Sequence, residues 1–85
     1  MYRVLLSKSA RRFYEDADAP LQRKVDRCFE SLGTDPRRHP NVKALKGELN
    51  GYYRYRVGDY RVVYHIEEAE LQIVVAVIAH RSEVY

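Results

Sequence analysis

Residues 52–79 carry the pattern that most constrains the fold, because their apolar residues recur with a period of two. Three segments, 52–57, 60–66 and 71–79, are rich in tyrosine, valine and isoleucine, and the short sequences GD and EEAE separate them. This spacing is typical of β-strands that are joined by hairpin turns. The sequence therefore predicts a three-stranded antiparallel meander in the C-terminal half.

The N-terminal part of the chain has a helical period instead. Ser7 or Ser9 can cap a first helix, and apolar residues follow at helical spacing. The sequence DAP ends this helix, Pro20 suits the first turn of a second one, and Gly33 ends that second helix. Its apolar stripe consists of Leu21, Val25, Cys28, Phe29 and Leu32. The pattern predicts a helical hairpin with one apolar face.

The remaining segments complete an α+β fold. The sequence MYRVLL predicts a first strand, and residues 33–51, with two prolines and three glycines, predict an irregular connection. We expect a small antiparallel sheet, made of the N-terminal strand and the three-stranded meander, with the helical hairpin packed on one face. Because 85 residues that are 46% apolar can bury only one core, residues 1–85 are expected to form a single domain.

The composition argues against several classes of protein. Cys28 is the only cysteine, which excludes an internal disulfide and a multi-cysteine zinc site, and the histidines lack the spacing of zinc ligands. We therefore expect no metal ion and no other cofactor. The N-terminal apolar run is too short for a signal peptide, and no segment has the ~20 apolar residues that span a bilayer. The expectation is a cytoplasmic protein without a membrane partner.

The register of the first hairpin follows from its turn. If residues 58–59 form a two-residue loop, the numbers of each opposed pair add up to 117, and Tyr53 faces Tyr64 while Tyr55 faces Val62. Aromatic and β-branched pairs of this kind suit the packing of one face beneath the helices. This face of the hairpin is expected to belong to the core.

The other face of the same hairpin is cationic. Arg56 lies opposite Arg61 with Arg54 on the diagonal, and Tyr52 and His65 stand at the end of the row. Opposed like charges destabilise a sheet, and no carboxylate lies among the neighbouring strand residues. One interpretation is an ordinary solvated face. The other is a phosphate-binding surface, on which tyrosines stack with bases.

Extending the register across EEAE pairs Ile66 with Leu71 and places Ala76 beside Arg61. An apolar floor for the arginines is then expected from Val63, Val74 and Ile78. Strand parity predicts His80 on the arginine face and Arg81 on the other.

Two lysines precede the arginine strands. Lys43 and Lys46 either extend a phosphate track toward ribosomal RNA or are solvated surface residues.

Three sequence motifs resemble the RelE/ParE superfamily of bacterial and archaeal toxins. They are LKG, YRYRVGDYRVVY and the C-terminal HRSEVY, and the order of predicted elements over the whole chain is also that of the family. Within the superfamily the chain resembles the RelE branch more than the ParE branch. The resemblance implies that residues 1–85 form a RelE-like toxin domain. It also implies that the protein is the toxin of a type II toxin–antitoxin system.

The RelE branch consists of metal-independent endoribonucleases that cut mRNA in the ribosomal A site, through attack of a ribose 2′-hydroxyl on the adjacent phosphate. The resemblance implies that such a reaction is inhibitory to translation and that a cognate antitoxin neutralises it. Residues that match the family's functional positions are Arg54, Arg56, Arg61, Arg81 (or alternatively His80) and Tyr85.

The expected roles differ among these residues. Arginine is a poor general base, so Arg54, Arg56 and Arg61 are expected to clamp phosphates and to stabilise the transition state. Tyr85 is expected to stack on a nucleotide or orient it. Histidine is the residue type that changes charge near neutral pH, so His80 either acts as an acid or base or only positions its neighbour.

Two other functions compete with the nuclease. The ParE branch implies a DNA gyrase inhibitor that cuts nothing itself, and a plain nucleic-acid-binding module would use the arginines for backbone contacts only. The resemblance also implies a RelB-like antitoxin partner, which we expect to be acidic and amphipathic. Operator DNA would be contacted only through the toxin–antitoxin complex, whereas the ribosome and mRNA are the expected direct partners of the toxin.

Overall fold

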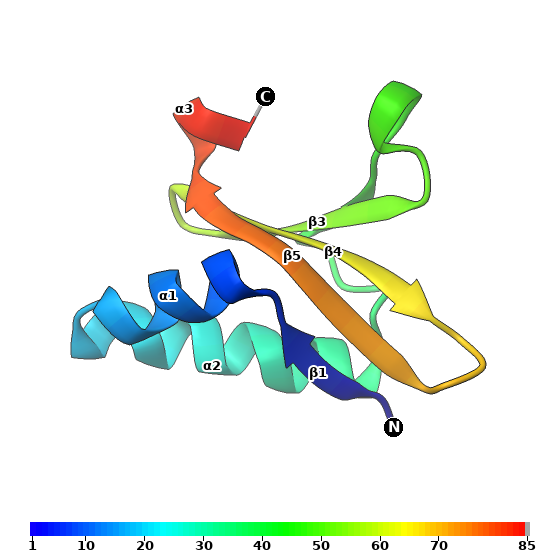
Figure 1. Ribbon diagram of the computed structural model, residues 1–85, viewed down its shortest axis with the longest axis horizontal. Coiled ribbons are helices and arrows are strands. Elements are labelled where there is room, and N and C mark those ends of the chain that lie inside the picture. Colours follow the sequence, from blue (N-terminus) through cyan, green and yellow to red (C-terminus); the bar gives the residue numbers. More distant parts are fainter. Residues whose placement is uncertain (85) are drawn as a thin grey trace.

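A five-stranded sheet with the strand order β1-β5-β4-β3-β2 forms the frame of the molecule. The computed structural model describes residues 1–84. Its elements are β1 (Arg3–Leu6), α1 (Lys8–Asp16), α2 (Ala19–Thr34), β2 (Val42–Ala44), the 3-10 helix η1 (Gly47–Leu49), β3 (Tyr52–Val57), β4 (Tyr60–Glu67), β5 (Gln72–His80) and α3 (Arg81–Val84). Figure 1 shows α1 and α2 together on one side of the sheet, with η1 and α3 rising on the other.

The helical hairpin forms as the sequence predicts. The Ser7 hydroxyl accepts a hydrogen bond from the Ala10 amide at 3.1 Å and begins α1. The Asp18 carboxylate accepts one from the Leu21 amide at 3.0 Å and begins α2, with proline in its first turn. Helix α2 ends at Thr34, one residue beyond the predicted end. No helix within the described residues is long and apolar enough to cross a membrane.

The core lies between the two helices and the sheet. Tyr64 is its largest fully buried side chain, and its hydroxyl donates a 2.6 Å hydrogen bond to the Pro36 carbonyl. Its ring stacks on Tyr53 at a centroid distance of 5.7 Å. The buried core residues are Ala10, Val25, Cys28, Leu32, Tyr55, Val57, Val62, Tyr64, Ile73, Val75 and Ile78. The apolar stripe of α2 and the predicted core face of the hairpin therefore meet here.

The register of the β3–β4 hairpin is confirmed. Tyr53 pairs with Tyr64, and Arg56 pairs with Arg61. Gly58 occupies the first position of the two-residue turn with φ 57°, a backbone conformation that glycine adopts without strain. One face of the hairpin is thus apolar and the other cationic, as the alternation predicts.

The predicted β4–β5 register was wrong. Ile66 pairs with Ile73 rather than with Leu71, and Arg61 lies beside Ala79 rather than Ala76. Leu71 belongs to the turn, with φ 51°. This placement of Leu71 is one cause of the different register. The other is a β-bulge, which inserts one extra residue into a strand and shifts the register by one residue between Val63 and Tyr64.

Near the end of β5, the bulge also reverses which face of the sheet each residue points to. Ile78 pairs with Val62 and lies in the core, so the prediction that it forms the floor of the arginine face was wrong. Val77, which is 40% exposed, pairs with Val63 instead. His80 pairs with Tyr60, so its predicted place on the arginine face was wrong as well.

Two further features of the sheet differ from the expectation. Strand β1 pairs with β5 in parallel, which makes the sheet mixed rather than antiparallel. Strand β2 lies in the segment predicted to be irregular, and pairs with β3 from Val42 to Ala44. Three residues between a proline and a glycine are too short to give a period-two signal.

Candidate nucleic-acid interface

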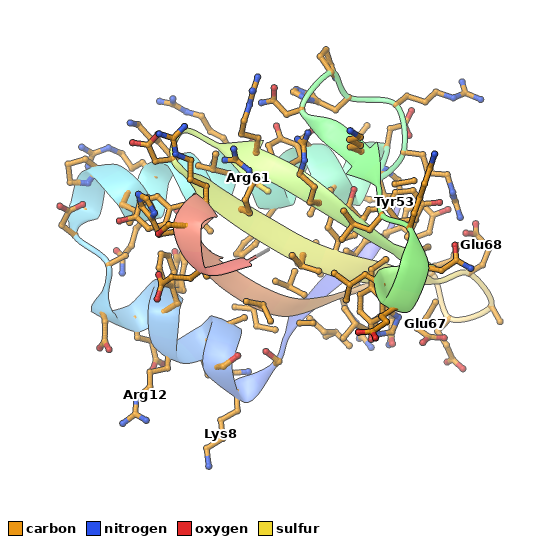
Figure 2. All side chains as sticks on the ribbon, turned by 90° about the horizontal axis from the view of Figure 1, so that it is seen from above. Lys8, Arg12, Tyr53, Arg61, Glu67 and Glu68 are labelled. Atoms are coloured by element: carbon orange, nitrogen blue, oxygen red, sulfur yellow. The ribbon has the colours of Figure 1, made fainter. Side chains whose placement is uncertain are left out.

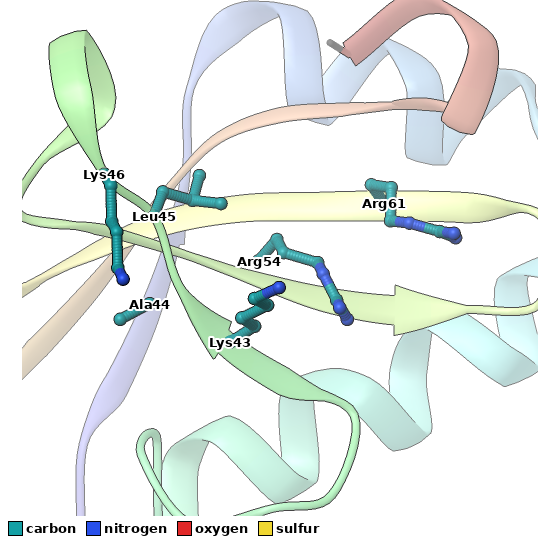
Figure 3. Close-up of a pocket in the computed structure, with 6 residues that line it drawn as sticks. All are labelled: Lys43, Ala44, Leu45, Lys46, Arg54 and Arg61. Carbon is teal, nitrogen blue, oxygen red and sulfur yellow. The ribbon is translucent and has the colours of Figure 1, made fainter.

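An open hollow of about 440 Å³ lies on the sheet face opposite α1 and α2. Its lining consists of Lys43, Ala44, Leu45, Lys46, Arg54 and Arg61 (Figure 3). Strand β2 makes the hollow possible, because it places Lys43 directly opposite Arg54 on β3. Four cationic side chains from three strands and a loop therefore surround one space.

The guanidinium of Arg54 is fixed by the main chain. Its Nη1 donates a 2.9 Å hydrogen bond to the carbonyl oxygen of Asn41, and the side chain is half-buried. The same carbonyl accepts the Arg56 amide at 3.1 Å. A guanidinium has five N–H donors, so Arg54 retains donors for an anion in the hollow.

Arg61 is held in a similar way. Its Nη1 donates to the carbonyl oxygens of Gly58 at 3.1 Å and Tyr60 at 3.0 Å. Figure 2 shows Arg61 on the sheet face where α3 lies. The opposed Arg56 is exposed to solvent, which lowers the repulsion between the two like charges.

The arginines of this face have no carboxylate partner within residues 1–84. The ion pairs there join Arg37 to Glu68, His65 to Glu67, and Arg81 to Asp59. Val63, which is 5% exposed, pairs with Arg54 and supplies an apolar neighbour on the same sheet face. Unpaired cations beside a low-dielectric surface favour the binding of an anion.

The C-terminal segment begins at the turn that holds Arg61. The Arg81 amide donates to the Asp59 carbonyl oxygen at 2.8 Å, and its Nε lies 3.9 Å from the Asp59 carboxylate. The structure therefore brings Arg81 to the Arg61 end of the hairpin. The predicted site residue Tyr85 lies outside the described residues.

The His80 ring contacts Tyr60 of β4, and its Nδ1 contacts Ser82. The Ser82 amide donates to Nδ1 at 3.2 Å, and the Ser82 hydroxyl lies 2.9 Å from the same atom. An accepting Nδ1 requires the neutral ring to carry its proton on Nε2. The ring meets Tyr60 edge-on at a centroid distance of 5.6 Å, and Tyr60 in turn packs on Phe13 of α1. His80 thus lies toward the helices and caps the start of α3.

Tyr52 and His65 lie at the far end of the hairpin and do not line the hollow. Their rings meet edge-on at 5.2 Å, and His65 Nδ1 lies 3.2 Å from the Glu67 carboxylate. Four residues along a strand separate them from the Arg56–Arg61 pair, a distance of about 13 Å. The structure does not bring them together with Arg61.

Three positioning residues are not predicted by the sequence pattern. Asn41 holds Arg54, Asp59 holds Arg81, and Ser82 holds His80. Asp59 has a turn signal in the sequence, but the contact of Asn41 depends on the unpredicted strand β2. Residues 1–84 contain no group of three His, Cys, Asp or Glu side chains that could hold a metal ion.

Known proteins are similar to this chain in both sequence and fold. Residues 4–85 match the family model described as ParE toxin of type II toxin-antitoxin system, parDE. Toxin RelG of Mycobacterium tuberculosis is 31% identical over 85 residues, which cover 99% of this chain and 95% of that protein.

Two solved complexes contain similar chains. One is the toxin–antitoxin complex RelBE2 from Mycobacterium tuberculosis, with a TM-score of 0.80 and 27% identity over 94% of this chain and 98% of that one. The other is the archaeal RelE–RelB complex from Pyrococcus horikoshii OT3, with a TM-score of 0.81 and 25% identity over 98% of both chains. The chain therefore belongs to the RelE/ParE superfamily of toxins from type II toxin–antitoxin systems.

Proposed function

We propose that this toxin is a ribosome-dependent endoribonuclease that cleaves mRNA in the A site and so inhibits translation. The observation that carries the proposal is the hollow that Lys43, Arg54 and Arg61 line without a carboxylate partner in the described chain. A phosphate group supplies the missing negative charge, and guanidinium groups match its geometry.

The reaction makes a bond between the ribose 2′-oxygen and the adjacent phosphorus and breaks the bond from phosphorus to the 5′-oxygen. The 2′-hydroxyl loses a proton and the leaving 5′-oxygen gains one. Negative charge develops on the phosphorane oxygens between these events. Arg54 and Arg61 are oriented by main-chain carbonyls before any substrate arrives, so they stabilise that charge at little reorganisation cost.

The other predicted site residues have supporting roles in this proposal. Arg56 and Arg81 bind flanking phosphates, and Tyr85 stacks on a nucleotide. Lys43 and Lys46 extend the phosphate track, with Tyr52 and His65 at its far end. We assign His80 a positioning role, because its Nδ1 is engaged by Ser82 and its ring packs against Tyr60.

The proposed partner that restrains the toxin is a RelB-like antitoxin. The similar chains from Mycobacterium tuberculosis and Pyrococcus horikoshii were solved in complex with antitoxins. An acidic, amphipathic segment would neutralise the arginines. Operator DNA is then contacted only through the complex. The proposed action on ribosomes would take place in the cytoplasm.

A DNA gyrase inhibitor is the second candidate function. The observation in its favour is that the matching family model is that of the ParE toxin. Such a toxin binds a protein target, so its unpaired arginines would meet acidic side chains rather than phosphates.

Inducible expression tests the two candidates against each other. The 5′ ends of cellular mRNA are mapped after induction of the wild type and of Arg61→Ala, and gyrase trapped on DNA is measured in parallel. The proposal expects growth arrest with translation-dependent cuts that Arg61→Ala abolishes. Intact mRNA with trapped gyrase supports the ParE function. A chain without toxicity would be a plain nucleic-acid-binding module.

A further inference from the structure

A second, smaller hollow of about 200 Å³ lies where α2 approaches β3. Its lining includes three cations, Lys24 and Arg27 from α2 and Arg56 from β3, together with Asn41. All three cations are exposed, and none takes part in the ion pairs of residues 1–84. This hollow is separate from the one around Arg54 and Arg61.

The local sequence explains how the three charges meet. Lys24 and Arg27 are three residues apart and so share a face of α2, while Val25 and Cys28 turn to the core. Arg56 lies between two buried residues of β3 and so belongs to the outer face of the sheet, from which it lines the hollow at the edge that α2 approaches.

Asn41 connects the two hollows. It lines the smaller hollow, and its carbonyl oxygen accepts both the Arg54 guanidinium of the larger hollow and the Arg56 amide. Arg54 and Arg56 are two strand residues apart, about 6.6 Å. A backbone bound at Arg54 can therefore continue to Arg56 without leaving the protein surface.

We propose that Lys24, Arg27 and Arg56 form a second phosphate site for single-stranded RNA, which continues the track of the larger hollow over the edge of the sheet to α2. The inference deepens the proposed function and rests on it for the identity of the nucleic acid. The surroundings favour RNA over a protein segment. An amphipathic peptide needs exposed apolar surface. Among the side chains that the structure describes, the exposed large apolar ones, Met1, Leu5, Leu49, Leu71 and Val77, do not line this hollow.

The test measures binding of the purified full-length chain to fluorescein-labelled oligouridylate by anisotropy at several salt concentrations. The Lys24→Ala/Arg27→Ala variant is compared with Lys8→Ala/Arg12→Ala. The control removes the same charge from α1, and Figure 2 shows both control residues away from Arg61. Each lost phosphate contact flattens the slope of log affinity against log salt by ~0.7, so the double variant should flatten it by about 1.4 and bind roughly tenfold more weakly.

Equal slopes for the double variant and the control would overturn the inference. It would also be overturned if the double variant kept the wild-type slope but lost antitoxin binding, because the site would then serve an acidic protein. Failure of the proposed function is distinguishable. Suppose that the slopes of the wild type and the double variant differ as expected, but the wild type cuts no mRNA on ribosomes. The second phosphate site is then supported and the proposed nuclease function is contradicted.

Discussion

The two faces of the β3–β4 hairpin differ in how their polar groups are satisfied. On the helix side, Tyr64 is fully buried and its hydroxyl has a partner in the Pro36 carbonyl. On the outer side, Arg54 and Arg61 keep donors free and have no carboxylate partner in the described chain. The helix side satisfies its polar groups internally, whereas the outer side leaves its charges for a ligand.

We therefore expect stability and the proposed activity to depend on opposite faces of one hairpin. Substitutions on the helix side should lower the free energy of unfolding. Substitutions on the outer side should lower activity and leave the free energy of unfolding unchanged. Cys28 supplies a common readout of unfolding. Burial raises the pKa of its thiol, so thiol reagents should modify it only when the chain unfolds.

The largest stability loss is expected from Tyr64→Ala. The substitution removes the largest fully buried side chain, and it should cost about 3–5 kcal/mol of the free energy of unfolding. Urea unfolding followed by Cys28 labelling measures the loss. A variant as stable as the wild type would show that the helix side of the hairpin does not form the core.

The mirror experiment on the outer side is Arg54→Ala. Loss of one preorganised donor should lower the single-turnover rate of mRNA cleavage by about 10²–10³-fold, with an unchanged midpoint of unfolding. Lys8→Ala serves as the charge-matched control on α1. An equal loss of activity in both variants would mean that net charge, rather than the hollow, determines the rate.

Tyr64→Phe sharpens the comparison by removing a single oxygen. The Pro36 carbonyl then loses a 2.6 Å hydrogen bond inside the protein, so about 1–3 kcal/mol of stability should disappear. Thermal unfolding measures the change, and cleavage by the folded fraction should stay at the wild-type rate. A wild-type melting temperature would contradict the assigned role of this hydrogen bond.

His80→Gln tests the residue between the two faces. If His80 only positions the C-terminal segment, the cleavage rate should fall by less than about tenfold and the pH profile should keep its shape. A general acid or base would instead cost about 10²–10⁴-fold and would remove one limb of the profile. Rates measured from acidic to alkaline pH distinguish these outcomes.

The smallest effect concerns Glu68, which lies outside both faces. Hydrogen bonds from the Tyr2 hydroxyl at 2.5 Å and the Arg37 guanidinium at 2.8 Å hold the pKa of Glu68 below its ordinary value. Because its pKa is depressed, ionised Glu68 stabilises the fold at pH values above the ordinary glutamate pKa of about 4.3. This stabilisation is lost as the pH falls through the lower pKa of the folded state.

Glu68→Gln should therefore melt slightly below the wild type at neutral pH, with a difference that closes in acid. Scanning calorimetry from pH 3 to pH 7 follows that difference. A gap that stays constant over this range would show that the carboxylate charge contributes nothing.

The sequence predicted the helical hairpin and the register of β3 with β4, because caps, apolar periodicity and a two-residue turn are local signals. It did not predict the bulge between Val63 and Tyr64, since the extra residue has no sequence signal of its own. That single residue moved His80 to the side of Tyr60 and Ile78 into the core.

The candidate site was predicted in part for a similar reason. Arg54, Arg56 and Arg61 follow from strand alternation, and the structure places them on the expected face. Their division between two hollows depends on Asn41 and β2, which lie far from them in the sequence and show no periodic pattern. Tertiary contacts of that kind are not encoded in a local window.

Single-turnover cleavage of mRNA in the A site of purified ribosomes tests the central claim most directly. The wild type is compared with Arg61→Ala, and Cys28 labelling confirms that both are folded. We predict cleavage by the wild type and a loss of about 10²–10³-fold in the variant, at equal stability. Absence of cleavage by the folded wild type, or an undiminished rate in Arg61→Ala, would contradict the assignment of the outer face as a phosphate-cleaving site.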